Sequence, residues 1–169
     1  MEHIKNDPAH QSWNPEEVDE GLKRFYNISD EIDEAIYRNE LEQAVFLANE
    51  YLVLADEYNK NWNFGNAIHY SNIVLGIVEL RKGNGSMAAE YLMRSGKSPG
   101  SPQLDTFGPD LELANVLLSD GFKEQVIIYL RSIKTFWEKS DEAIELMVHK
   151  IESGQVVKIS NRTLFYDKS

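Results

Sequence analysis

The chain has 169 residues and no cysteine, and its 28 acidic residues against 17 basic ones give a net charge of −11. This length suits a single domain with one core, and the absence of cysteine excludes disulfides, thiolate metal sites and thiol nucleophiles. The acidic balance argues against nucleic acid or an anionic membrane surface as the main partner. Because no apolar run approaches the roughly 20 residues that span a bilayer, and the N-terminus lacks the layout of a secretion signal, we expect a cytoplasmic protein.

Nearly all of the negative charge lies in the first third of the chain. The first 60 residues hold 15 acidic and 5 basic side chains, whereas the rest of the chain holds 13 and 12. One acidic block contains Glu16 and Glu17, and a second contains Asp30 and Glu34. These blocks are either solvated helix faces or a surface that steers a basic partner.

The spacing of apolar residues predicts about seven helices within residues 14–154, after a flexible arm over residues 1–13. A capped start is expected at Asn14-Pro15-Glu16-Glu17, and the first helix weakens and can break at Asn27–Ser29. The run Ile73–Leu80 is so densely apolar that we expect the third helix to be central and buried on most sides.

The second half of the chain contains the clearest loop and a distinct tail. Residues 97–106 predict a loop, and Gly108-Pro109-Asp110 restarts a helix. Trp137 is expected to face inward on the sixth helix, and a seventh runs from Ser140-Asp141 to Gly154. The tail, residues 155–169, predicts either a small hairpin or an apolar arm that docks on the helices.

Tight turns predicted at Asn39, Gly83 and Gly121 divide the helices into antiparallel pairs. The clearest pair carries small and apolar residues at a characteristic spacing: Leu75, Gly76, Gly83, Ala88, Leu92, Ser95 and Pro99. This spacing resembles one tetratricopeptide unit, with weaker echoes over about residues 30–138. The resemblance implies an all-α, right-handed superhelix of stacked helical hairpins. A packing argument agrees, because one amphipathic hairpin cannot bury its apolar face and three stacked pairs can.

The motifs that could carry catalysis have simpler explanations. Gly83–Ala88 matches a G-x-G-x-x-A nucleotide fingerprint, but the alternating buried strands of a dinucleotide fold are missing. Glu145 and His149 share a helix face without further metal ligands at suitable spacing. We therefore expect no catalytic residue, no metal and no cofactor.

The best candidate binding residues lie at the start of the third helix. Trp62 and Tyr70 are interleaved with asparagines that include Asn66, a combination that can hold an extended peptide. The alternative is that they are core aromatics and helix-capping asparagines. His69 is either a residue lining the groove or an ordinary histidine at the edge of the core.

These observations predict a non-catalytic adaptor or regulatory module that binds a protein or peptide, with the acidic first helix favouring a basic partner. The expected contacts are Trp62, Asn66, His69 and Tyr70 together with the acidic residues Glu16, Glu17, Asp30 and Glu34. One alternative is an acidic inhibitor or immunity-type protein that neutralises a basic enzyme. Another is a structural homodimer that exchanges its C-terminal tail, and the least expected is a helical enzyme.

Overall fold

A computed structural model describes residues 19–159, and these residues form an all-α fold without a strand. Eight α-helices agree with the prediction of about seven. Their bounds are α1 (Glu20–Tyr37), α2 (Leu41–Glu57), α3 (Phe64–Arg81), α4 (Gly85–Ser95), α5 (Pro102–Phe107), α6 (Glu112–Ser119), α7 (Lys123–Ile133) and α8 (Asp141–Glu152). None of these helices combines the length and apolarity needed to cross a bilayer.

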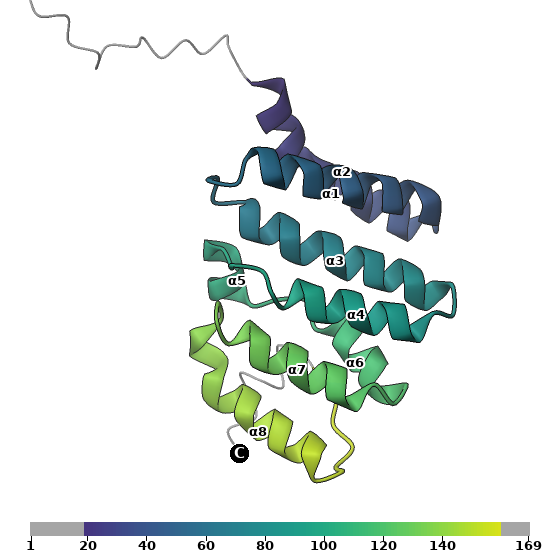
Figure 1. The fold of residues 1–169 in the computed structure, drawn as a ribbon, viewed down its shortest axis with the longest axis vertical. Helices are drawn as coiled ribbons and strands as arrows, with labels where there is room; N and C mark the ends of the chain where they lie inside the picture. The colour runs from purple at the N-terminus through teal and green to yellow at the C-terminus, as the bar shows by residue number, and fades with distance from the viewer. Residues whose placement is uncertain (1–18, 160–169) are drawn as a thin grey trace, which may run out of the picture.

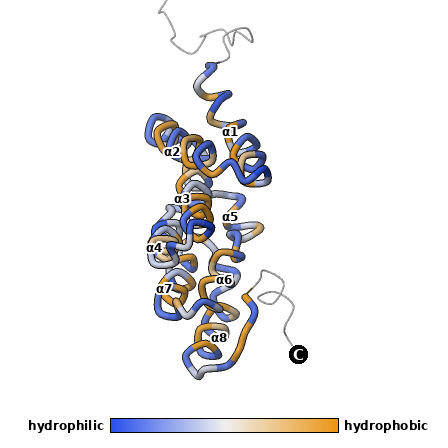
Figure 2. The backbone as a smooth tube through the Cα atoms, turned by 90° about the vertical axis from the view of Figure 1, so that its right-hand side faces the viewer, coloured by the Kyte–Doolittle hydropathy of each residue, from blue (hydrophilic) through white to orange (hydrophobic). Residues whose placement is uncertain are grey.

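The long helices lie side by side in one stack, in which α2, α3, α4, α7 and α8 follow one another (Figure 1). Seen from the side, α2, α4 and α7 lie on one side of the stack, and α1, α5 and α6 lie on the other, with α3 between them (Figure 2). The pairs α1–α2, α3–α4 and α6–α7 are each joined by a tight turn. This arrangement places α1, α3 and α5 around a shared surface.

The three predicted turns share one backbone geometry. Asn39, Gly83 and Gly121 all adopt the left-handed conformation, with φ of 58°, 82° and 94°. After each of them, the next N–H donates to the carbonyl five residues earlier: Glu40 to Ala35, Asn84 to Glu79 and Phe122 to Leu117, at 2.8–2.9 Å. This hydrogen bond is the Schellman helix stop, so the sequence correctly located the three reversals.

Helix α3 is central, as its apolar density predicted, and its burial differs from the amphipathic pattern of the other helices. Ten of its residues are buried, and the five buried hydrophobic side chains among them divide between two clusters rather than one continuous core. Val74 packs with α1 and α2, whereas Ile73 packs with the helices that follow. The crossing with α4 is close at Gly76, where an added Cβ would lie 3.3 Å from the Ala88 carbonyl oxygen.

One expectation about α1 needs correction, and another lies outside the described residues. The helix does not break at Asn27–Ser29, because Ile28 is fully buried against α2 and α3 and holds the helix continuous through this polar stretch. Within the described residues α1 begins at Glu20, where the Asp19 carboxylate accepts hydrogen bonds from the N–H groups of Gly21 and Leu22. The start predicted at Asn14-Pro15 lies outside the described residues.

The second half of the chain departs from prediction in three places. The predicted loop contains the short helix α5, which Ser101 caps, and α6 begins at Glu112 rather than at Gly108. Helix α7 ends at Ile133, so Trp137 is buried after the helix rather than on it. In the described part of the tail, Ile159 is buried, and its N–H donates to Asn115 Oδ1 at 2.9 Å. This contact holds the described end of the tail against α6, and residues 160–169, which the predicted hairpin also needs, lie outside the described range.

Candidate functional site

A pocket of about 280 Å³ opens where α1, α3 and α5 meet. Helix α3 supplies four of the ten lining residues, more than any other helix, and the segment between α5 and α6 contributes one carboxylate. The lining residues are Ser29, Tyr51, Asn63, Asn66, His69, Tyr70, Ile73, Gln103, Leu104 and Asp110. Three of the four residues that the sequence singled out at the start of α3 therefore share one cavity.

Two asparagines at the start of α3 hold one wall of this pocket in place. Buried Asn63 donates from Nδ2 to the Tyr51 hydroxyl at 2.9 Å, and its Oδ1 accepts from Asn66 Nδ2 at 3.0 Å. Asn66 Nδ2 also donates to Gln103 Oε1 at 3.2 Å, and Asn66 Oδ1 accepts from the Ser101 hydroxyl. Because each amide is already committed, this network joins α2, α3 and α5 into a rigid wall.

His69 is nearly fully buried and carries an acceptor that no described residue satisfies. Its Nδ1 lies 3.1 Å from the Ser95 carbonyl oxygen. A carbonyl only accepts, so Nδ1 carries the proton and Nε2 presents a lone pair. Among residues 19–159, Nε2 has no hydrogen-bond partner. The ring stacks on Tyr129 at 6.4 Å and meets the Phe136 ring edge-to-face at 6.0 Å, and burial lowers the pKa of His69.

Negative charge surrounds the pocket. The Tyr70 hydroxyl donates to the Asp33 carboxylate on α1, and burial together with this contact raises the pKa of Tyr70. Asp110 lies at the rim, where its Oδ1 accepts from the Glu112 N–H at 2.8 Å and its carbonyl oxygen accepts from the Tyr129 hydroxyl at 3.3 Å. The Asp110 charge also opposes the lowering of the His69 pKa by burial. Among residues 19–159, no lysine or arginine lines the cavity.

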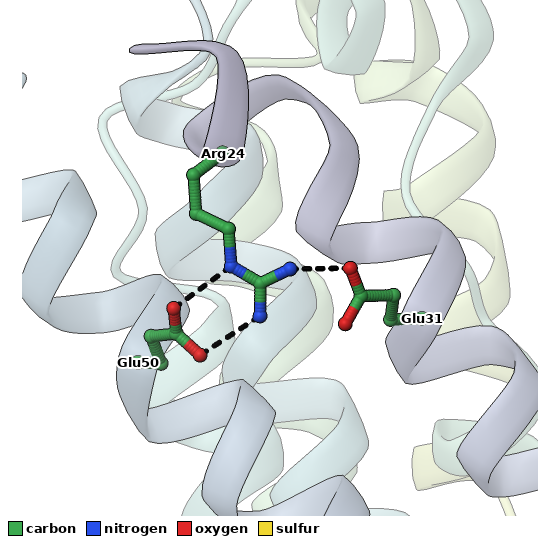
Figure 3. A network of polar contacts seen from close by, with 3 residues as sticks. All are labelled: Arg24, Glu31 and Glu50. Atoms are coloured by element: carbon green, nitrogen blue, oxygen red, sulfur yellow. Dashed lines mark hydrogen bonds and ion pairs between the residues drawn. The ribbon is translucent and has the colours of Figure 1, made fainter. Parts of the chain in front are cut away.

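The acidic block on α1 is exposed, but most of it is already paired. The Arg24 guanidinium binds Glu50 through two contacts and Glu31 through a third (Figure 3). Glu34 pairs with Arg38 one turn along the chain. Asp30 has no hydrogen bond or ion pair to any described residue. Because Glu31 and Glu34 are paired with arginines, the negative field of this face is weaker than the count of its carboxylates indicates.

The other predicted contacts are not at the pocket. Trp62 is half exposed and stacks on Tyr26 at 5.6 Å, and the Tyr26 hydroxyl accepts from Asn61 Nδ2. Asp30 and Glu34 lie on the exposed face of α1, and Glu16 and Glu17 lie outside the described residues. The structure therefore separates the predicted set into a pocket, an aromatic pair and a charged face.

Some pocket residues had no signal in the sequence that distinguished them. Gln103 lies in a segment predicted to be a loop, and Asp110 looked like part of a helix start. Ser29 and Tyr51 belong to separate helices and meet the others only through tertiary packing.

The described residues carry few elements of catalytic chemistry. Between residues 19 and 159, no three His, Asp or Glu side chains cluster closely enough to hold a metal ion. No serine or threonine hydroxyl in this range hydrogen bonds to a histidine ring, so no nucleophile–base pair of that type is formed there. Comparison with protein-family models, curated proteins and solved structures finds no match to this chain.

Proposed function

We propose that the protein is a non-catalytic module that binds an extended, basic protein segment on the surface formed by α1, α3 and α5. The observation that carries the proposal is the pocket in which Asn66, His69 and Tyr70 meet next to the acidic face of α1. Stacked helical hairpins of the tetratricopeptide type present such a surface, and the antiparallel pairs of this fold support that interpretation.

Shape and charge both favour an extended peptide. The pocket of about 280 Å³ lies at the lower end of the roughly 300–1,000 Å³ typical of sites for drug-sized ligands, and it has room for a side chain of a bound peptide. Helix α1 alone carries five carboxylates against two cations. A peptide that crosses this helix and inserts one side chain would use both features.

Selection of linear peptides from a displayed library against the full chain tests this function. We expect the selected peptides to be basic and their affinity to fall when salt rises from about 0.05 M to about 0.5 M. The variant Ser29→Phe fills the pocket from α1 and should abolish binding. Ser86→Phe, on the exposed start of α4, is the matched control and should leave binding unchanged. Equal affinity of the two variants would place the binding surface elsewhere.

The exposed carboxylates of α1 also favour an acidic inhibitor of a basic enzyme as a second candidate. Under that function, the double change Asp30→Lys and Glu34→Lys should weaken binding strongly, whereas Ser29→Phe should have little effect. The charge reversal should weaken a basic partner under either function, so the response to Ser29→Phe distinguishes the two.

A further inference from the structure

His69, which lines the pocket, carries a buried hydrogen-bond acceptor without a partner among the described residues. The Ser95 carbonyl fixes the tautomer of His69, and the unprotonated Nε2 has no partner among the described residues. An unsatisfied buried polar atom costs free energy, so a ligand that donates a proton to this nitrogen would recover that cost. An anion or a carbonyl group could not.

The charge of the pocket favours a cation over a neutral donor. Among the described residues that line the pocket, Asp110 is the only ionised one, and none is cationic. Its Oδ1 accepts from the Glu112 N–H, and no described residue donates to its second carboxylate oxygen. The Asp110 charge also acts on the buried rings, since it contributes to the raised pKa of Tyr70 and of Tyr129.

The two acceptors, one Asp110 oxygen and His69 Nε2, belong to different side chains, which favours an ammonium group over a guanidinium group. An arginine side chain binds best where one carboxylate offers both of its oxygens to the planar fork. Asp110 offers one oxygen, whereas His69 offers one ring nitrogen. A lysine ammonium is a compact point charge with three donors, and Ile73 and Leu104 supply an apolar wall for its stem.

We propose that this pocket binds the side chain of a lysine residue in the partner segment, with its ammonium group donating to Asp110 and to His69 Nε2. This inference rests on the proposed function, because the lysine belongs to the peptide that the α1, α3 and α5 surface binds. It identifies the anchor residue, which the proposed function leaves open.

Blocked amino acids test the anchor without a partner. The probes are Nα-acetyl-lysine N-methylamide, its neutral norleucine counterpart and its arginine counterpart, each titrated into the full-length, ¹⁵N-labelled protein. The ring-nitrogen signals of His69 and the backbone amide of Asp110 report binding. We expect the lysine probe to shift both sets of signals, the norleucine probe to shift neither and the arginine probe to bind more weakly than lysine.

Matched variants separate a specific contact from general attraction. Asp110→Asn keeps an oxygen for the Glu112 N–H and should weaken the lysine probe about tenfold. Asp120→Asn removes the same charge at the exposed end of α6 and should leave the affinity unchanged. No shift with lysine, equal binding of norleucine, tighter binding of arginine or an equal effect of the two variants would overturn the proposal.

The same chemistry distinguishes failure of the anchor from failure of the function. If selected peptides bind in a manner sensitive to Ser29→Phe but tolerate replacement of each lysine by norleucine, the surface is correct and the lysine anchor is wrong. Where peptide binding does not respond to Ser29→Phe, the proposed function itself fails.

Discussion

Arg24 on α1 and Glu50 on α2 form a two-point ion pair, with Nε 2.8 Å from Oε1 and Nη2 2.9 Å from Oε2. The two side chains are about one-third exposed. Their hydrogen bond raises the pKa of Arg24 and lowers the pKa of Glu50. Glu31 binds the remaining side of the same guanidinium group (Figure 3), so a single cation orders the acidic surface between the first two helices.

The change Arg24→Lys should destabilise the fold by about 1 kcal/mol, because an ammonium group cannot reproduce the planar two-point contact. The free energy of unfolding from urea titration is the measurement. Arg131→Lys is the matched control, since Arg131 contacts Glu152 through one exposed contact of 3.0 Å, and it should change stability by less than about 0.5 kcal/mol. Equal effects would mean that the geometry of the Arg24 pair contributes nothing.

Stability should fall as the pH drops below the ordinary histidine pKa of 6.5, because burial lowers the pKa of His69 in the folded state. Below pH 6.5 the unfolded chain binds a proton that the folded chain excludes, so this contribution is complete above that pH and is lost below it. The loss can reach about 1.4 kcal/mol per pH unit. Urea unfolding at about pH 7.5 and about pH 5.5 measures it.

The variant His69→Gln should flatten this dependence on pH, whatever its effect on absolute stability. The Ser95 carbonyl and the Asp110 charge favour the protonated ring, but both act against the larger effect of burial. His149→Gln is the control, because His149 is exposed on α8, and it should keep the slope of the unmodified protein. An unchanged slope in His69→Gln would show that other groups cause the acid sensitivity.

Replacement of Gly65 by alanine should destabilise the protein by about 1–3 kcal/mol, although alanine is the better helix former by about 1 kcal/mol. An added Cβ would lie 1.7 Å from the Gly100 carbonyl oxygen, where the loop before α5 crosses α3. The Ser98 hydroxyl already holds this loop by donating to the Gly65 carbonyl at 2.7 Å. Thermal unfolding measures the effect.

The control for Gly65 is Ser86→Ala on the exposed first turn of α4. There the change should be neutral or slightly stabilising, because only helix propensity acts. A Gly65→Ala protein as stable as the unmodified chain would mean that the loop can move away from α3 at little cost.

The variant Asn63→Ala should cost about 1–3 kcal/mol, because it removes the donor to the buried Tyr51 hydroxyl and the acceptor for Asn66. Denaturant titration measures the loss. Asn49→Ala, which affects only an exposed contact to the Val45 carbonyl within α2, should be neutral or slightly stabilising. We also expect Asn63→Ala to weaken peptide binding, since Asn66 then loses one of its fixed contacts.

Local sequence information predicted the features that depend on near neighbours. Asn39, Gly83 and Gly121 stop helices because glycine and asparagine tolerate the left-handed conformation, and that tolerance is a property of the residue itself. The apolar density of Ile73–Leu80 likewise predicted a central helix, because such a surface has to be covered on several sides. Local propensity failed at Asn27–Ser29, where Ile28 packs against neighbouring helices.

Only the tertiary structure decided the composition of the site. Asn66, His69 and Tyr70 could be proposed from one helix, but Ser29, Gln103 and Asp110 reach the same pocket from segments about 35–45 residues away. The free lone pair of His69 depends on the position of the Ser95 carbonyl, and the paired state of Glu50 on α2 depends on Arg24 on α1. Contacts between distant segments carry no local signal in the sequence, because they arise only when helices pack together.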